Sequence, residues 1–230
     1  MKKFAVAFPY SSEPADFAAF SHEALDVRGD EHAASRAALG VVDERVWVQT
    51  NPDGSKVAVV YLVGRDPIED NKRFAASQEP YDLWFKDKAS KVTGQDIHEP
   101  FPVHPDLVYE SIPAGADPAH SAFLALPLID TDAYLAMVAE VNGPRRAAFD
   151  AFHERAGITE DWYLERTPDG DFALVHLSSP DLGKAVGHLA SSTDEIEQWF
   201  KAQLLASQGI DWNEPPAGPL PECVMSWQAR

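Results

Sequence analysis

The sequence contains the same turn twice, and each copy lies between two β-rich segments. Asn51-Pro52-Asp53-Gly54 returns as Thr167-Pro168-Asp169-Gly170, 116 positions later. Proline presets φ for the second position of a tight turn, aspartate bonds its own backbone, and glycine accepts a positive φ. Such a turn between two apolar, β-branched runs predicts a β-hairpin. The chain is therefore predicted to use one hairpin twice.

Other landmarks repeat at nearly the same spacing. Trp84-Phe85-Lys86 returns as Trp199-Phe200-Lys201, 115 positions later. Three further pairs are separated by 114 or 115 positions: Gly29 and Gly143, Gly94-Gln95-Asp96 and Gly209-Ile210-Asp211, and Glu99-Pro100 and Glu214-Pro215. Because separate landmarks keep one spacing, the sequence indicates an internal duplication.

Each half is predicted to have the element order β-α-β-β-α-β. In the first half, the expected elements are a strand over 4–8, a helical stretch over 14–39 with a break near 28–30, hairpin strands near 43–50 and 55–63, a helical stretch over 67–93 with a break near 78–80, and a strand over 107–109. In the second half they are a strand over 123–128, a helix capped by Thr131, a break at Gly143 with Pro144 opening the next helix, the second hairpin, one helix over about 181–207, and a strand over 224–227.

This order is that of a ferredoxin-like unit, a sheet with two helices on one face. A lone unit leaves its other sheet face bare, and two tandem units can cover both by packing them together. We therefore predict an α+β fold of two tandem ferredoxin-like (βαββαβ) repeats packed sheet to sheet as an intramolecular barrel. The expected boundaries are 1–112 for the first repeat, 113–120 for a linker and 121–230 for the second repeat.

The composition limits the partners of the chain. Its 230 residues carry a formal net charge of −18, which disfavours phosphate backbones and anionic lipid, so we expect neither nucleic-acid nor membrane partners. Cys223 is the single cysteine, so an internal disulfide cannot form. The apolar run over 4–8 is too short for the core of a signal peptide. We expect a cytoplasmic protein that is a monomer with an internal pseudo-dimer, or a homodimer.

With these motifs in place, the chain resembles the dimeric α+β barrel superfamily in its tandem, single-chain form. The stretches Asn142-Gly143-Pro144-Arg145-Arg146, Gly157-Ile158-Thr159, Pro168-Asp169-Gly170 and Trp199-Phe200-Lys201 are similar to an uncharacterised bacterial family of that superfamily. The superfamily includes cofactor-free antibiotic-biosynthesis monooxygenases, small-lactone isomerases, sugar mutarotases, haem proteins and proteins without demonstrated activity. The resemblance implies a ligand site between helices and sheet.

Positions where the two halves differ in polarity are candidates for a site. Val60 in the first half corresponds to His176 in the second, which stands among apolar neighbours. An imidazole there could act as a base or orient a ligand near neutral pH. The alternative is a core histidine bonded to a backbone carbonyl or a carboxylate. His176 is therefore the predicted catalytic residue, with that alternative open.

Three aromatic residues are predicted to contact a ligand: Trp47, Trp162 and Tyr163. Flat rings with a polar atom suit a pocket for an aromatic or polyketide-like compound, and equally suit a seam between helix and sheet. Because strand side chains alternate, Trp162 and Tyr163 point to opposite faces and at most one of them lines a given cavity. Trp84 and Trp199, present in both halves, are predicted to be core.

Arg145 and Arg146 form a cationic pair that could attract a small anionic substrate in an acidic protein. Arg146 is the predicted ligand-binding member, and the alternative is a solvated helix face on which it pairs with Asp150. We expect no metal site, since His98-Glu99 and His153-Glu154 lack the HExxH spacing and no Cys/His cluster exists. A haem reading would need a helix histidine such as His153 or His188.

The predicted function is small-molecule binding without a cofactor. If the protein is an enzyme, the class to test is cofactor-free monooxygenation or isomerisation of an aromatic or polyketide-like compound. The alternative is a non-catalytic ligand-binding or stress-related protein whose aromatic residues form only core.

Overall fold

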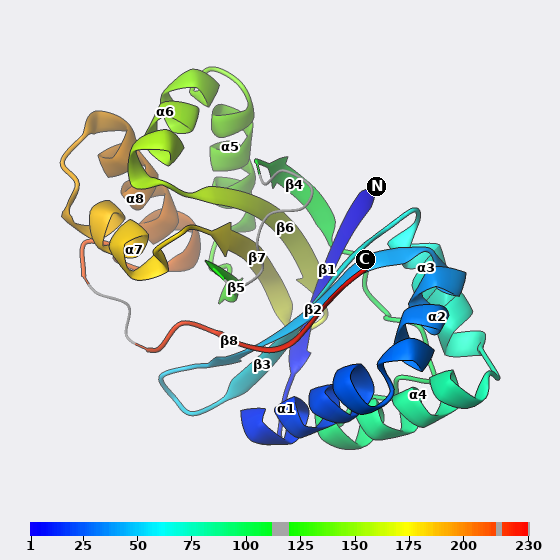
Figure 1. Cartoon of the computed structure of the whole chain (residues 1–230). Helices are drawn as coiled ribbons and strands as arrows, with labels where there is room; N and C mark the ends of the chain where they lie inside the picture. The colour runs from blue at the N-terminus through cyan, green and yellow to red at the C-terminus, as the bar shows by residue number, and fades with distance from the viewer. Residues whose placement is uncertain (112–119, 215–217, 230) are drawn as a thin grey trace. The chain divides into compact units, whose positions relative to one another are not determined.

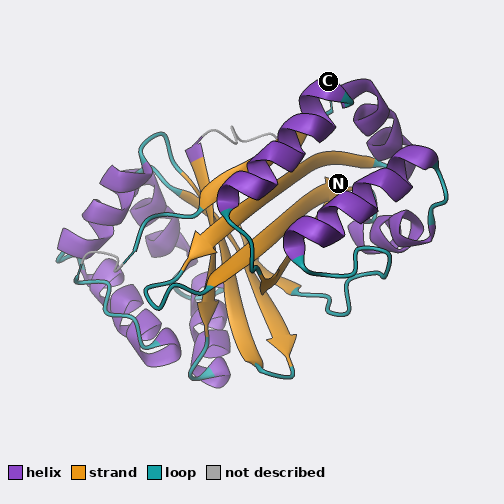
Figure 2. Cartoon of the chain, turned by 90° about the horizontal axis from the view of Figure 1, so that it is seen from below, coloured by secondary structure: helices purple, strands orange, loops and turns teal. Residues whose placement is uncertain are grey.

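The computed structural model describes residues 1–111, 120–214 and 218–229, which form an α+β protein of two compact units (Figure 1). The first unit comprises Met1–Pro105 and Leu220–Arg230, and the second comprises Asp106–Pro219. Each unit contains one four-stranded antiparallel sheet. Figure 2 shows helices lying along the strands of both sheets. The predicted linker over 113–120, except its last residue, and Pro215 of the repeated Glu-Pro pair lie outside the described residues.

The sheet of the first unit has the order β1-β3-β2-β8. Its strands are β1 (Lys2–Pro9), β2 (Val41–Thr50), β3 (Lys56–Gly64) and β8 (Glu222–Gln228). Its helices are α1 (Pro14–His22), the π-helix η1 (Glu23–Val27), α2 (Gly29–Leu39), α3 (Pro67–Ala76) and α4 (Pro80–Thr93). Phe17, Phe20 and Phe85 from these helices pack on Val46 and Val48 of the sheet, which places the core between the two layers.

The second unit repeats this arrangement with the sheet order β4-β6-β7-β5. Its strands are β4 (Asp106–Glu110), β5 (Ser121–Pro127), β6 (Thr159–Thr167) and β7 (Gly170–Ser178). Its helices are α5 (Thr131–Asn142), α6 (Arg146–Ala156), α7 (Leu182–Ser191) and α8 (Glu195–Gln208). Phe149, Phe152 and Phe200 from the helices pack on Trp162 and Leu164 of the sheet. The predicted strands and the predicted hairpins are present.

The fourth strand of each sheet comes from the other half of the sequence. Strand β8 pairs with β2, so the red C-terminal strand lies beside β2 in Figure 1, and β4 pairs with β6. Residues 106–110 and 222–228 thus leave the halves to which the sequence boundaries assign them. Short alternating apolar strands fit either sheet equally well, so the side-chain pattern does not select their partner.

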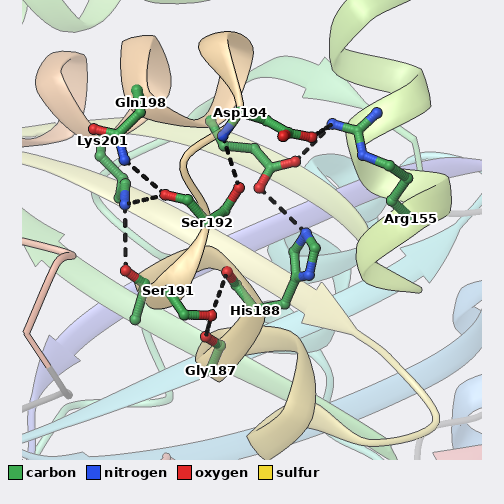
Figure 3. Close-up of polar contacts among 10 residues, drawn as sticks. Arg155, Gly187, His188, Ser191, Ser192, Asp194, Gln198 and Lys201 are labelled. Carbon is green, nitrogen blue, oxygen red and sulfur yellow. Dashed lines mark hydrogen bonds and ion pairs between the residues drawn. The ribbon is translucent and has the colours of Figure 1, made fainter.

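The repeated Trp-Phe-Lys motif connects consecutive helices. The Lys86 ammonium, on α4, donates to the carbonyls of Ala75 and Ser77 at 2.8 Å each, at the end of α3. The corresponding Lys201, on α8, donates to Ala190 at 3.3 Å and Ser192 at 2.9 Å, at the end of α7 (Figure 3). Each buried lysine therefore satisfies carbonyls that a helix end leaves without partners.

One helix was predicted for the segment that carries Lys201, and this prediction is wrong. The segment over 181–207 is two helices, because the chain bends at Ser192 as it does at Ser77, although no proline marks the second bend. Two helix starts also differ from the prediction. Asp130, whose side chain accepts from the Ala133 amide at 2.9 Å, caps α5 in place of Thr131. Pro144 lies in a turn, and α6 begins at Arg146.

A buried carboxylate connects the three helices α6, α7 and α8. Glu197 is fully buried and lies 2.6 Å from the Arg155 guanidinium and 3.2 Å from His188 Nε2 (Figure 3). Burial alone would raise the pKa of Glu197, but hydrogen bonds from Ser192 and Arg155 and the nearby His188 hold it below its usual value. The charge therefore stabilises the helix layer of the second unit above the acid range.

Because β8 completes the sheet of the first unit, we predict that this unit depends on the C-terminal end of the chain. In a chain ending at Pro219, β2 loses its β8 neighbour and the core loses Val224 and Met225. We expect fast amide hydrogen exchange across β2 and retained protection in β6 and β7. A peptide of residues 220–230 added in trans should restore protection of β2. Unchanged protection of β2 in the shortened chain contradicts this dependence.

Candidate functional site

Each unit has a small cavity between its helices and its sheet. The cavity of the first unit has a volume of about 70 Å³, and that of the second about 50 Å³. Both are lined mainly by apolar and aromatic side chains, but each also contacts a glutamate. Glu44 on β2 and Glu160 on β6 stand 116 positions apart, and both are buried. A buried carboxylate needs partners, and the two units provide different ones.

In the first unit, Glu44 is held by a permanent cation. The Arg36 guanidinium donates to both Glu44 oxygens and lies over the rings of Phe74 and Phe85, at 4.8 and 4.5 Å from their centroids. His32 Nε2 lies 3.3 Å from the same carboxylate. Burial would raise the pKa of Glu44, but the charge of Arg36 and the bonds from His32 and Arg36 hold it at about 2. This carboxylate stays ionised.

The remaining polar groups beside this ion pair have protein partners too. His32 Nδ1 and the Tyr81 hydroxyl are 2.8 Å apart, and Arg36 Nη1 donates to Ser35 at 3.1 Å. Trp227, from the exchanged strand β8, places its ring edge-on to His32 at 5.2 Å. Apart from His32 Nε2, which contacts Glu44 without a hydrogen bond, these polar atoms of the first unit are bonded to protein groups, which favours a structural role.

In the second unit, Glu160 has weaker partners. The Trp162 indole N–H donates to Glu160 Oε2 at 2.8 Å, and His153 Nε2 lies 3.5 Å from the same oxygen. His153 stands on α6 where Arg36 stands on α2, 117 positions earlier. An imidazole can gain or lose a proton near neutral pH, whereas a guanidinium cannot. The second unit therefore places a carboxylate beside a group that can exchange protons.

Three polar atoms on residues that line the second cavity form no hydrogen bond with any described residue. They are the Tyr134 hydroxyl on α5, Oε1 of Gln208 at the end of α8, and the indole nitrogen of Trp212. Tyr134 and Gln208 are 1% and 5% exposed, so bulk water does not reach them freely. Burial raises the pKa of Tyr134 far above its ordinary value, so its hydroxyl stays a donor. Unpartnered buried polar atoms around one cavity indicate a place for a polar guest.

An outer hollow lies next to each cavity, with one aliphatic side chain bordering both spaces. In the second unit that side chain is Ile158, and the hollow has a volume of about 730 Å³. In the first unit it is Val41, and the hollow has a volume of about 960 Å³. Both residues follow a left-handed glycine that ends a helix, Gly40 or Gly157. The turn after the helix thus positions the wall between cavity and surface.

The structure brings only one of the predicted aromatic residues to the second cavity. Trp162 lines it, and its ring stacks on Phe200 with centroids 5.7 Å apart and planes inclined by 4°. Tyr163 and His176 lie on the sheet face opposite the helices, since Val175 and Leu177 line the cavity on either side of His176. The His176 ring stacks on Phe123 at 5.1 Å. His176 and Tyr163 are therefore not placed to serve this cavity.

The other predicted contacts also lie away from the helix–sheet cavities. Trp47 is on the far face of β2, because its neighbour Val46 lines the first cavity. Arg146 borders the outer hollow of the second unit and forms an ion pair with Asp150 at 2.9 Å, which is the alternative foreseen for it. Its guanidinium also lies 5.2 Å from the Tyr109 ring centroid.

Sequence reasoning missed Tyr134, Glu160, Gln208 and Trp212, and it considered His153 only as a possible haem ligand. Comparison of the halves could have found two of them, because Glu160 repeats Glu44 and His153 replaces Arg36. The other three look like ordinary helix or loop positions, and only their burial without a partner distinguishes them. Trp84 and Trp199, which were predicted to be core, are only partly buried and pack against the two cores.

No group of three or more His, Cys, Asp or Glu residues in the described ranges is arranged to hold a metal ion. Among the helices of the same ranges, all are too short or too polar to span a bilayer.

Comparison with known proteins identifies a shared fold. No family model and no curated protein matches the chain. A solved structure from Lactobacillus acidophilus NCFM, described as a putative monooxygenase, aligns over 100% of this chain and 97% of its own length, with a TM-score of 0.55 and 8% identity. A second, from Fusobacterium nucleatum subsp. nucleatum and also described as a putative monooxygenase, aligns over 98% and 93%, with a TM-score of 0.49 and 7% identity. The chain thus shares the fold of the Lactobacillus protein.

The two glutamates should respond differently to the same substitution. Glu44→Gln leaves Arg36 buried without its counter-ion, so we expect a loss of roughly 3–5 kcal/mol in the free energy of unfolding. Glu160→Gln keeps an acceptor for Trp162 and should cost about 1 kcal/mol. Urea unfolding at pH 7, followed by circular dichroism, measures both losses.

The loss caused by Glu44→Gln should also depend on pH. The pKa of Glu44 falls from 4.5 to about 2 on folding. Its charge therefore contributes about 3 kcal/mol of stability above pH 4.5, which is lost as pH falls towards 2. Repeating the urea series at pH 3 should narrow the gap between wild type and Glu44→Gln. Glu44 is held by a permanent cation, and Glu160 lies beside a group that can exchange protons. Equal losses of unfolding free energy for Glu44→Gln and Glu160→Gln at pH 7 contradict this difference.

Proposed function

We propose that the second unit binds a compact aromatic or enolisable molecule in its helix–sheet cavity, and that Glu160 removes a proton from it. The observation that carries this proposal is the set of unpartnered polar atoms of Tyr134, Gln208 and Trp212 around one cavity beside a buried carboxylate. The fold shared with a protein described as a putative monooxygenase supports the direction of the proposal.

The lining of the cavity defines the chemistry of its guest. The hydroxyl of Tyr134 and the N–H of Trp212 can donate to a carbonyl or phenolate oxygen, and Oε1 of Gln208 can accept from a hydroxyl. The stacked rings of Trp162 and Phe200 offer a flat apolar wall. A planar ring that carries a hydroxyl beside a carbonyl group matches both features.

Proton removal is the first step of both reactions in this class. Glu160 accepts the proton, and the electron pair stays on the ligand as an enolate. In an isomerisation, the proton returns to a different carbon. In an oxidation, the enolate carbon adds dioxygen to give a peroxide anion, which takes up a proton to become a hydroperoxide. Where that carbon carries a further hydrogen, loss of water leaves a carbonyl group. Both routes balance without an external reductant, so the proposal needs no cofactor.

We further propose that the two units are tandem repeats of the dimeric α+β barrel type, of which only the second keeps the site. Three correspondences between the units support a common origin. Lys86 and Lys201 each bond the end of the preceding helix, Glu44 and Glu160 line corresponding cavities, and the strand orders of the two sheets correspond. In the first unit, Arg36 occupies the position of His153 and closes the network.

The test compares a buried tyrosine whose hydroxyl has no partner among the described residues, Tyr134, with one whose hydroxyl is hydrogen-bonded, Tyr81. Tyr134→Phe should weaken binding of 2-hydroxy-1,4-naphthoquinone or 1-naphthol about tenfold or more, because a lost hydrogen bond to a buried ligand costs about 1.5 kcal/mol. Tyr81→Phe, whose hydroxyl is bonded to His32, should leave binding unchanged. Tryptophan fluorescence quenching measures affinity, and an oxygen electrode measures turnover.

The outcomes separate the functions. Binding with oxygen uptake or ligand isomerisation supports an enzyme, and binding without turnover supports the non-catalytic alternative. Equal affinity of Tyr134→Phe and wild type contradicts the site. Native mass spectrometry of freshly purified protein gives an independent reading, since a retained ligand adds mass that disappears on denaturation.

Ile158 should control access to this cavity. An aromatic ring needs a void of about 150 Å³, larger than the cavity in its closed form. Ile158→Ala joins the cavity to the outer hollow, so we expect faster association of the same probes in stopped-flow fluorescence. Stability should fall by roughly 2–5 kcal/mol. Val41→Ala, at the matched position of the first unit, is the control, and an equal change in association rate there contradicts a site in the second unit.

A further inference from the structure

His153 stands between the cavity and the outer hollow of the second unit. Its Nε2 lies 3.5 Å from Glu160, which lines the cavity, and His153 itself lines the hollow with Arg146 and Thr159. We propose that His153 is a proton-relay residue, which carries the proton taken up by Glu160 out to solvent in the hollow. The inference rests on the proposed role of Glu160, and its decisive test needs no ligand.

One oxygen of the Glu160 carboxylate is contacted by two side chains. The Trp162 indole N–H donates to Oε2 at 2.8 Å, while His153 approaches the same oxygen from α6. The Glu160 residue is only 8% exposed, so its carboxylate has little direct contact with solvent to which it could release a proton. The neighbouring imidazole is the group through which the proton can leave.

The His153 ring is equally constrained. Its centroid lies 4.4 Å from that of Phe149, 5.2 Å from that of Phe152 and 6.1 Å from that of Tyr109. These rings hold the imidazole at 5% exposure while it still borders the hollow. An imidazole takes a proton at one nitrogen and releases one from the other, so a fixed ring between two compartments can transfer protons without moving far.

Other charged or titratable groups lie around His153 on three further elements and on α6 itself. On α6, Arg146 is paired with Asp150, and Glu154 borders the hollow. On β4, burial raises the pKa of Tyr109 to about 12, so this phenol does not titrate near neutral pH. On β6 the facing group is Glu160 itself. Ahead of β5, His120 borders the same hollow.

The first unit shows what the same position does without a relay. Arg36 occupies the place of His153 and donates to both oxygens of Glu44. A guanidinium keeps its proton throughout the range in which proteins are stable, so it fixes the carboxylate charge and transfers nothing. The exchange of arginine for histidine therefore distinguishes a structural pair from a reactive one.

The proton balance is simple. The ligand gives a proton to Glu160, which becomes a neutral carboxylic acid. Glu160 passes that proton to Nε2 of His153, and Nδ1 releases a proton to water in the hollow. The carboxylate and the neutral imidazole are restored, with the nitrogen-bound proton on the other side of the ring. Passage of a proton back along the same path resets the tautomer, and that proton goes to the enolate in an isomerisation or to the peroxide anion in an oxidation.

The test uses the Trp162 indole N–H as a reporter of charge beside Glu160. In nitrogen–proton correlation spectra, with the signal assigned by Trp162→Phe, the wild-type indole resonance should shift as pH crosses the imidazole range. The shift should disappear in His153→Gln and in His153→Arg. His188→Gln, which removes a histidine bound to Glu197 instead, should keep it. The remaining five indole signals report whether each variant is folded.

The possible outcomes test the relay separately from the proposed function. A pH-dependent Trp162 shift that persists in His153→Gln overturns the relay, as does its absence in the wild type. If the naphthol probes are turned over, His153→Gln should lower kcat about tenfold or more with little change in KM, and added imidazole should restore it. Failure of the probes to bind, with the Trp162 shift intact, removes the proposed function and leaves the coupling of His153 and Glu160 in place.

Discussion

A carboxylate buried beneath a helix layer must be given partners, and that requirement organises both units of this protein. Glu44 on β2 and Glu160 on β6 lie in strands at corresponding places in the two sheet orders, and each lines the cavity between the helices and the sheet of its unit. Without partners, either charge would oppose folding. The first unit meets the requirement with a guanidinium and aromatic faces, and the second with an indole and an imidazole. Under the proposed function, the same constraint therefore produces a stable element in one unit and a reactive one in the other.

This difference suggests a division of roles between two units of one fold. Arg36 donates to both oxygens of Glu44 in the first unit, whereas the hydroxyl of Tyr134 and the carbonyl of Gln208 in the second unit have no hydrogen-bond partner among the described residues. Native proteins rarely leave such atoms buried unless a site requires them. A unit freed from binding can keep the more stable arrangement, while its counterpart keeps the less satisfied one.

Much of the fold could be predicted from local sequence, because turns, glycine stops and apolar periodicity act over a few residues. Gly40 and Gly157 end their helices, and the Pro-Asp-Gly turns join their strands. The partner of β8 could not be predicted, since its alternating pattern fits either sheet. The candidate site was harder still. Trp162 could be assigned to a cavity by its chemistry, but its orientation depends on register, which also turns His176 to the opposite face.

The strand exchange also sets the order in which this chain can acquire structure during synthesis. The sheet of the second unit can close once β7 has left the ribosome, because its borrowed strand β4 lies earlier in the sequence. The sheet of the first unit, although it is encoded first, waits for β8. Until Glu222–Gln228 has been made, β2 carries an open edge that can pair with any other extended segment. The half translated first is thus completed last, and its exposure to mispairing lasts through the translation of the second.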